Sequence, residues 1–301
     1  MLIVNEVSPW GEPAAPASAA APAGPTALRI ALGAQLRHLR EARDITREAA
    51  GDAIRGSGAK ISRMERGRVG LKERDVQDLL TFYGVTDPAE RDEILGLVRR
   101  ATTRGWWHEY ADVTPRWFEM FLGLEQSASI IRTYEAQFVP GLLQTPEYAR
   151  HVISLGPWRT PEIERRLELR LHRQELLTGA SAPTLWAVVE ETALRRPTAP
   201  APLMRAQREH LARMAEQPHI TLQLVPESFG GHPITGLPFT ILRFAEPDLP
   251  DVVYLEQLTG ALYLDRRNDV NYYQAALDSL CGQILTADET RAALRQLVDE
   301  G

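Results

Sequence analysis

Residues 46–67 read Thr-Arg-Glu-Ala-Ala-Gly-Asp-Ala-Ile-Arg-Gly-Ser-Gly-Ala-Lys-Ile-Ser-Arg-Met-Glu-Arg-Gly, and this stretch decides the fold of the N-terminal region. Thr46 and Ser57 are residue types that cap helix N-termini, whereas Gly56 and Gly67 are typical of helix ends. Two short helices joined by a tight turn are therefore predicted, as in a helix-turn-helix unit. Their close crossing is favoured by three small residues of the first helix: Ala49, Ala50 and Ala53.

The second helix of this unit has an apolar face and a basic face. Ile61 and Met64 are predicted to point inward, and the 100° step of an α-helix then sets the outward arc. Such an arc suits the major groove, because Arg grips guanine O6 and N7 while backbone N–H groups at a helix N-terminus meet phosphates. The arc is predicted to hold Ala59, Ser62, Arg63 and Arg66, with Lys60 at its border.

The charge of the chain is unevenly distributed. The whole sequence has 34 Lys and Arg against 40 Asp and Glu, a formal net charge of −6, so it is not a polycation that coats nucleic acid. Residues 29–74 differ, because they hold 12 basic and six acidic residues. Arg63, Arg66 and Arg68 would also suit a merely solvated helix. Caps, turn, small residues and local positive charge coincide, however, and together they favour DNA binding.

Length and composition predict two domains and a leader. The 301 residues are 44% apolar and 25% charged, which is enough material for packed cores. Residues 1–28 contain eight alanines and five prolines and are expected to form a disordered leader. Residues 29–104 show short amphipathic helices without a strand, which predicts a five-helix domain. Residues 105–301 are expected to form the second domain.

The second domain is expected to be α+β, so the fold class is mainly α with a mixed C-terminal domain. Helices are predicted at residues 118–132, 146–155, 161–177, 201–215, 270–285 and 288–298. Strands are predicted at residues 184–189, 220–225, 239–244, 252–255 and 261–264. The single cysteine, Cys281, cannot form an internal disulfide, and no apolar run approaches membrane-spanning length. A cytoplasmic, nucleoid-associated protein is expected.

The N-terminal region resembles the Cro/repressor-type (XRE) helix-turn-helix family of DNA-binding regulators. The resemblance lies in the stretches 36–40 (Leu-Arg-His-Leu-Arg), 45–47 (Ile-Thr-Arg) and 61–67 (Ile-Ser-Arg-Met-Glu-Arg-Gly). It implies an ion pair between Glu65 and Arg40. It also implies phosphate contacts by Arg47 and Ser57, although family members usually carry Gln at the position of Arg47. The residues that it places against base edges are Gly58, Ala59, Lys60 and Arg63.

Residues 106–297 resemble a second family, the Scr1-type, antitoxin-like domain of actinobacterial WhiJ-like regulators. The longest shared stretch is 134–149, Tyr-Glu-Ala-Gln-Phe-Val-Pro-Gly-Leu-Leu-Gln-Thr-Pro-Glu-Tyr-Ala. Shorter shared stretches lie at residues 124–128, 189–196 and 253–256. The resemblance implies a regulator of development or secondary metabolism, often encoded beside a small protein that acts as its partner.

The C-terminal domain shows little sign of catalysis. Glu190 and Glu191 are adjacent, so on a strand they would face opposite sides and share no acid–base task. The seven histidines have no paired metal-ligand spacing. We therefore expect no enzyme activity, no metal and no cofactor.

Two groups of residues are candidates for a ligand or partner site in this domain. The aromatic patch after the helix-turn-helix region either seals the two domains together or lines a pocket or partner groove; it comprises Trp106, Trp107, Tyr110 and Trp117. The second group lies on predicted strands, where alternate side chains either converge on a cavity or fill a core. It comprises Trp186, Tyr254, Glu256 and Tyr263.

The leading hypothesis is a sequence-specific transcription regulator that binds a double-stranded DNA operator as a homodimer, because one helix reads only a few base pairs. Its C-terminal domain would receive a small-molecule effector or a small protein encoded nearby. The alternative is an antitoxin-like protein whose main activity is to bind and neutralise a small polypeptide, with DNA binding serving autoregulation. No membrane partner is expected.

Overall fold

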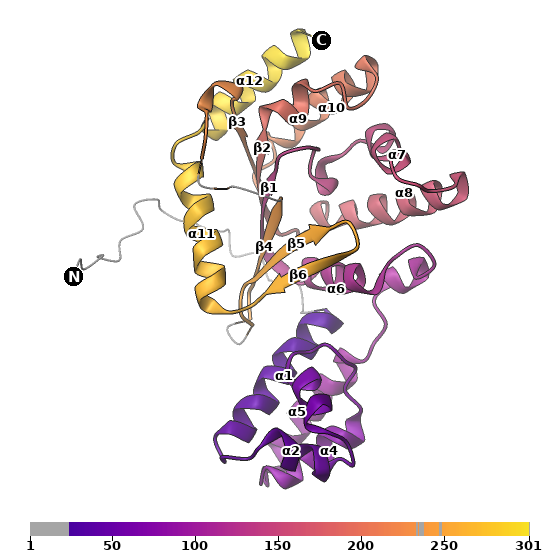
Figure 1. Ribbon diagram of the computed structural model, residues 1–301, viewed down its shortest axis with the longest axis vertical. Coiled ribbons are helices and arrows are strands. Elements are labelled where there is room, and N and C mark those ends of the chain that lie inside the picture. The colour runs from indigo at the N-terminus through magenta and orange to yellow at the C-terminus, as the bar shows by residue number, and fades with distance from the viewer. Residues whose placement is uncertain (1–23, 233, 235–237, 247–248, 301) are drawn as a thin grey trace, which may run out of the picture.

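The computed structural model describes residues 24–232, 234, 238–246 and 249–300. Within these residues the N-terminal domain is a five-helix unit, as predicted, at the bottom of Figure 1. Its apolar faces meet in one core, where Leu36, Ile61 and Leu80 are fully buried. The helices are α1 (Pro25–Glu41), α2 (Arg47–Ala53), α3 (Gly58–Glu65), α4 (Glu73–Phe82) and α5 (Pro88–Ala101).

Helix α1 begins earlier than the sequence indicated. Its first helical residue is Pro25, four residues before the predicted start of the domain at Arg29. Proline suits the first position of a helix, because its fixed φ is helical and its missing N–H is not needed there. Most of the predicted leader, residues 1–23, lies outside the described residues.

The C-terminal domain is built on a six-stranded mixed sheet with the order β3-β2-β1-β4-β5-β6. The three strands β3, β2 and β1 run parallel, whereas β4, β5 and β6 are antiparallel to their neighbours. Helices and strands together confirm the α+β prediction. The strands are β1 (Ala128–Glu135), β2 (Thr184–Glu190), β3 (Ile220–Val225), β4 (Phe239–Phe244), β5 (Val252–Gln257) and β6 (Gly260–Leu264).

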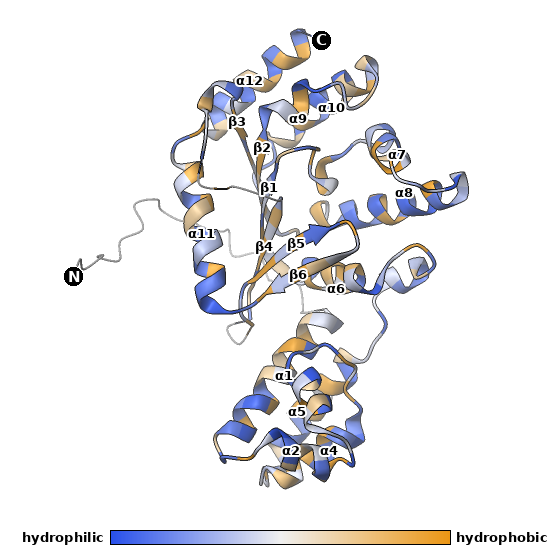
Figure 2. Cartoon of the chain, viewed as in Figure 1, coloured by the Kyte–Doolittle hydropathy of each residue, from blue (hydrophilic) through white to orange (hydrophobic). Residues whose placement is uncertain are grey.

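Helices cover both faces of this sheet. One core joins Ile131, Leu185 and Leu242 of the strands to α6, α10 and α12, and a second joins strand residues such as Val188 to α11. Figure 1 shows α11 on one side of the strands and α6 to α10 on the other, and Figure 2 shows apolar residues along the central strands. The helices are α6 (Arg116–Glu125), α7 (Pro146–Ser154), α8 (Thr160–Gln174), α9 (Glu191–Arg195), α10 (Ala201–Met214), α11 (Arg267–Cys281) and α12 (Ala287–Asp299), with 3-10 turns η1 (Trp106–Tyr110), η2 (Gly141–Leu143), η3 (Glu175–Leu177) and η4 (Glu227–Phe229).

The prediction of one helix over residues 118–132 is wrong in its second half. Helix α6 ends at Glu125, and residues from Ala128 onward form β1, which pairs with β2 on one side and β4 on the other. The β-branched residues Ile130, Ile131 and Thr133 favour a strand. A central strand is covered on both faces, so it lacks the alternating polarity that identifies a half-exposed strand.

Candidate nucleic-acid interface

The turn between α2 and α3 is fixed by its caps and by one glycine. Thr46 Oγ1 accepts the Ala49 N–H at 3.1 Å, and Ser57 Oγ accepts the Lys60 N–H at 3.3 Å, so both predicted caps are confirmed. The closest approach occurs at Gly51, where an added Cβ would lie 2.6 Å from the carbonyl carbon of Ser57. The flanking alanines, which the sequence indicates for this role, are therefore not the closest contact, and Gly51 was not predicted.

The two helices end by different means. Helix α2 is followed by Arg55 in the left-handed region, at φ 53°, so the chain turns there and not at the predicted Gly56. Helix α3 ends at Glu65 and is followed, as predicted, by Gly67 in the left-handed region, at φ 63°. The Gly67 N–H donates to Met64 O at 3.0 Å and the Arg68 N–H to Arg63 O at 2.9 Å, which together form a Schellman motif.

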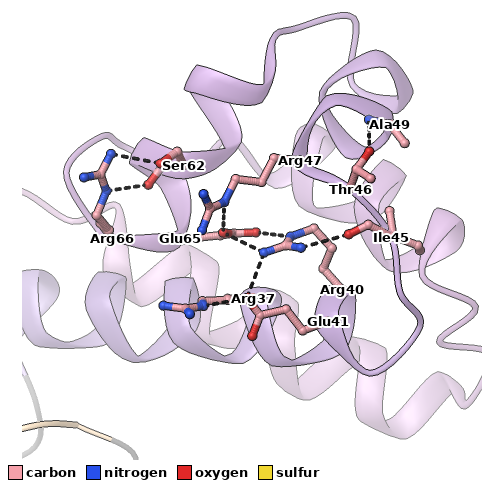
Figure 3. A network of polar contacts seen from close by, with 10 residues as sticks. All are labelled: Arg37, Arg40, Glu41, Ile45, Thr46, Arg47, Ala49, Ser62, Glu65 and Arg66. Carbon is pink, nitrogen blue, oxygen red and sulfur yellow. Dashed lines mark hydrogen bonds and ion pairs between the residues drawn. The ribbon is translucent and has the colours of Figure 1, made fainter. Parts of the chain in front are cut away.

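The buried carboxylate of Glu65 links helices α1, α2 and α3 (Figure 3). Glu65 of α3 accepts from Arg40 Nε at 2.5 Å and from Arg40 Nη2 at 3.2 Å, and both side chains are less than 10% exposed. This confirms the implied pair between Glu65 and a helix 1 arginine. The hydrogen bond to Glu65 raises the pKa of Arg40. Arg47, at the start of α2, joins the same carboxylate through Nε at 3.2 Å.

All nine residues predicted to contact DNA retain access to solvent. Six are exposed, namely Arg47, Ser57, Ala59, Arg63, Arg66 and Arg68, and the remaining three are half-buried, namely Gly58, Lys60 and Ser62. Ile61 and Met64 are buried on the opposite side of α3, as their spacing predicted. The helix therefore presents the predicted arc to solvent.

The basic side chains of this arc differ in what they contact. Lys60 Nζ lies 2.6 Å from Asp75 Oδ2 of α4, so its charge is directed toward a neighbouring helix. Arg66 folds back onto Ser62, with its Nε 2.9 Å from the carbonyl oxygen and its Nη2 2.9 Å from the hydroxyl (Figure 3). Within the described part of the chain, the Arg63 side chain has no hydrogen bond or ion pair. Arg63 is therefore the cation of α3 that is free to contact a base.

The aromatic patch of the sequence divides into two places. Trp107 and Tyr110 are buried in a small cluster with Leu122 of α6 and Leu169 of α8. Trp106 is only partly buried and lies against the His172 ring, with the two ring centroids 4.1 Å apart.

Trp117 lies apart from the other three aromatic residues. It packs on the main core of the C-terminal domain, and its carbonyl oxygen accepts the Tyr263 hydroxyl at 2.5 Å. The four side chains therefore do not line one site.

The strand residues proposed to share a cavity also separate. Trp186 packs on the α11 side of the sheet, and its N–H donates to Gln223 at 2.8 Å. Tyr254 and Tyr263 belong to the opposite side, where Tyr254 stacks on an α6 ring and its hydroxyl donates to Glu256 at 2.9 Å. Trp186 is thus not brought together with Tyr254, Glu256 and Tyr263.

A buried polar network, which was not predicted from the sequence, accounts for buried polar groups in the stretch 134–149. Gln144 is 3% exposed, donates to Val139 O at 2.8 Å and accepts from Arg170 Nη1 at 2.7 Å. Gln207, fully buried on α10, donates to Leu143 O at 2.7 Å. These side chains satisfy the backbone of the η2 turn, which lies inside the fold. The motif therefore serves the architecture of the domain.

The same region contains a strongly perturbed carboxyl group. Burial, and then the nearby Glu256 carboxylate, raise the pKa of Glu135 at the end of β1 to about 8. The Arg173 guanidinium of α8 acts in the opposite direction on this pKa, and it donates two hydrogen bonds to Glu125 of α6, the longer one at 2.8 Å. Charged groups thus lie between α6, α8 and the sheet.

Comparison with known families identifies both domains. A family described as Domain of unknown function (DUF5753) matches residues 118–296, more than half of the chain. The chain belongs to this family. A second family, described as Helix-turn-helix domain, matches residues 31–94, which contain α2, α3 and the turn between them. No curated protein and no solved structure matches the chain.

The helix-turn-helix match makes this DUF5753 chain a DNA-binding regulator. The match agrees with the geometry of α2 and α3, in which a capped, solvent-facing helix carries a free arginine. Among the described residues, no helix is both long and apolar enough to span a membrane.

Proposed function

We propose that the chain is a sequence-specific transcription regulator of the XRE type that places the N-terminal half of α3 in the major groove. The observation that carries this proposal is the outward arc of α3, where Arg63 is exposed and has no partner among the described residues. Gly58 and Ala59 lack long side chains, so the helix N-terminus can approach the base edges closely. Arg47 contacts Glu65 through its Nε, at 3.2 Å, so its two terminal nitrogens are available to contact a phosphate.

The regulator is proposed to bind as a homodimer in the cytoplasm, on the nucleoid. One α3 helix contacts only a few base pairs, and two helices one turn of DNA apart multiply the affinity. The operator is then a pair of similar half-sites, and analytical ultracentrifugation of the protein with and without DNA measures the stoichiometry directly.

Selection of bound duplexes from a random DNA pool tests the DNA-binding proposal. Wild-type protein should enrich one sequence, and Arg63→Ala should lose preference at one guanine, a change of about 1–3 kcal/mol in discrimination. Arg99→Ala is the matched control, because Arg99 is an exposed arginine of α5 that pairs with Glu73 at 2.7 Å. Enrichment of the same sequence by wild type and Arg63→Ala would refute this role for α3.

The C-terminal domain is proposed to receive the signal that controls DNA binding, in the service of development or secondary metabolism. Support comes from the resemblance to WhiJ-like, Scr1-type regulators and from the packing of α6 of this domain against α1 of the DNA-binding domain. Native mass spectrometry of the protein from its own host separates the options. A bound mass below about 1 kDa favours a small-molecule effector. A companion of several kDa favours a small protein partner and the antitoxin-like alternative.

A further inference from the structure

A cavity of about 180 Å³ lies where η1, α6 and α8 meet. Its apolar lining comes from Trp106, Leu122 and Leu176. The Trp106 indole is only partly buried and lies against the imidazole of His172, whose Nδ1 is 3.4 Å from the Tyr110 hydroxyl. The cavity is therefore bounded by aromatic rings that are held in place by their neighbours.

The charged side chains that line this cavity are Glu125, Arg173 and Glu175, and together they carry a net negative charge. Arg173 is the one positively charged group of the lining, and it donates two hydrogen bonds to Glu125, whose side chain is 2% exposed. That pair is electrically neutral. Glu175 remains at the rim with only a distant histidine contact, at 3.9 Å from His172, and Gln126 adds an amide. An aromatic wall next to a rim carboxylate is a favourable environment for an organic cation.

We propose that this cavity binds a small organic ammonium compound, with its apolar body against Trp106 and its charged nitrogen toward Glu175. The volume of the cavity, about 180 Å³, accommodates a molecule of the scale of an arylalkyl amine. An anionic ligand is disfavoured, because it would face the Glu175 carboxylate while the guanidinium of Arg173 is already occupied by Glu125.

The position of the cavity connects it to the DNA-binding helix, and this step rests on the proposed function. Immediately after the lining residues of α6, Ser127 Oγ accepts the Gly24 N–H at 3.0 Å, at the start of α1. Further along α1, Arg29 Nε donates to Gly67 O at 2.8 Å, at the end of α3. A ligand that shifts α6 therefore acts on one end of a short chain of contacts, which runs from α6 through α1 to the end of α3.

Three probes that share one aromatic body and differ in charge test the binding site. Isothermal titration calorimetry of the full chain without DNA should show saturable binding of 2-phenylethylammonium. The neutral 2-phenylethanol should bind roughly two- to fivefold more weakly, the range expected for an ion pair with an exposed carboxylate. The anionic 3-phenylpropionate should bind still more weakly. Equal binding of the three probes, or no saturable binding of the ammonium, would overturn the proposal.

A pair of charge variants, at Glu175 and at Glu168, locates the site. Glu175→Gln should weaken binding of the ammonium roughly two- to fivefold, because it removes the exposed rim carboxylate. Glu168→Gln is the control, since Glu168 lies on α8, which leads directly into η3, and pairs with Arg165 at 2.9 Å, outside the cavity. Equal effects of the two variants would place the cation elsewhere.

The regulatory step is measured separately from binding. If the cavity controls α3, saturating 2-phenylethylammonium changes the affinity for the selected DNA duplex, and by linkage the duplex changes the affinity for the ammonium by the same factor. Both factors equal to one would remove the regulatory role. If the chain bound no DNA, the proposed function would be refuted. The calorimetric result for ligand binding to the cavity would still stand.

Discussion

Replacing Asp75 with Asn should strengthen DNA binding by releasing Lys60. The ammonium of Lys60 lies 2.6 Å from the Asp75 carboxylate, which holds it against α4. The Asn side chain keeps the size of Asp but removes the charge. One released cation near the groove adds about one phosphate contact, which makes the slope of log affinity against log salt about 0.9 more negative. Between 50 and 200 mM salt, the variant should therefore lose roughly 3.5-fold more affinity than wild type.

Fluorescence anisotropy of a labelled duplex, titrated at a series of salt concentrations, measures this slope. The ion pair is partly exposed and contributes up to about 1 kcal/mol, so the domain should remain folded. Glu73→Gln is the matched control, because it removes the same charge from α4 but frees Arg99 instead. An unchanged slope for Asp75→Asn would refute the reasoning. An equal change in the control would show that net charge, and not Lys60, is responsible.

Three further substitutions test the buried parts of the structure. Glu65→Gln removes a carboxylate whose side chain is 3% exposed and pairs with two arginines, so urea denaturation should show a loss of about 3–5 kcal/mol; a loss within error would contradict the network. Gly51→Ala places a Cβ 2.6 Å from the backbone of the turn and should cost about 1–3 kcal/mol in the same assay. Gly96→Ala adds a Cβ that would lie 4.0 Å from the Arg99 side chain, in ordinary contact, and should instead gain up to about 1 kcal/mol; equal effects of the two substitutions would argue against a close crossing. The pKa of Glu135 is raised from 4.5 to about 8, so its ionisation opposes folding. As the pH rises from 4.5 to about 8, the free energy of unfolding should fall by up to about 1.4 kcal/mol per pH unit. Chemical denaturation at several pH values should show a smaller pH dependence for Glu135→Gln than for wild type.

The helix-turn-helix unit could be predicted because its determinants are local. Caps at Thr46 and Ser57 and the left-handed Gly67 depend on residues within one or two turns, and the structure has all three. The partners of Lys60 could not be predicted in the same way. Asp75 lies 15 residues further along the chain, and only the packing of α3 beside α4 brings the two charges together.

In the C-terminal domain, local sequence patterns did not predict strand β1 or the face of the sheet on which Trp186 lies. Strand β1 has both faces covered, and its polar and apolar residues do not alternate, so periodicity does not distinguish it from the end of a helix. The side of the sheet on which Trp186 lies depends on register, because a shift by one residue reverses the direction of every side chain. Sequence periodicity alone gives no register between strands that are far apart in the chain.

Helix α1 belongs to two hydrophobic cores, and this affects how the protein can be divided or recombined. Ala27, at its first turn, is fully buried in the core of the C-terminal domain, whereas Leu32 and Leu36 are buried in the core of the DNA-binding domain. Separation at residue 28 would leave a gap in one core and shorten a helix of the other. Exchange of the DNA-binding domain between relatives should succeed only when the surface of α6 is exchanged with it, so the two domains are expected to evolve as one unit.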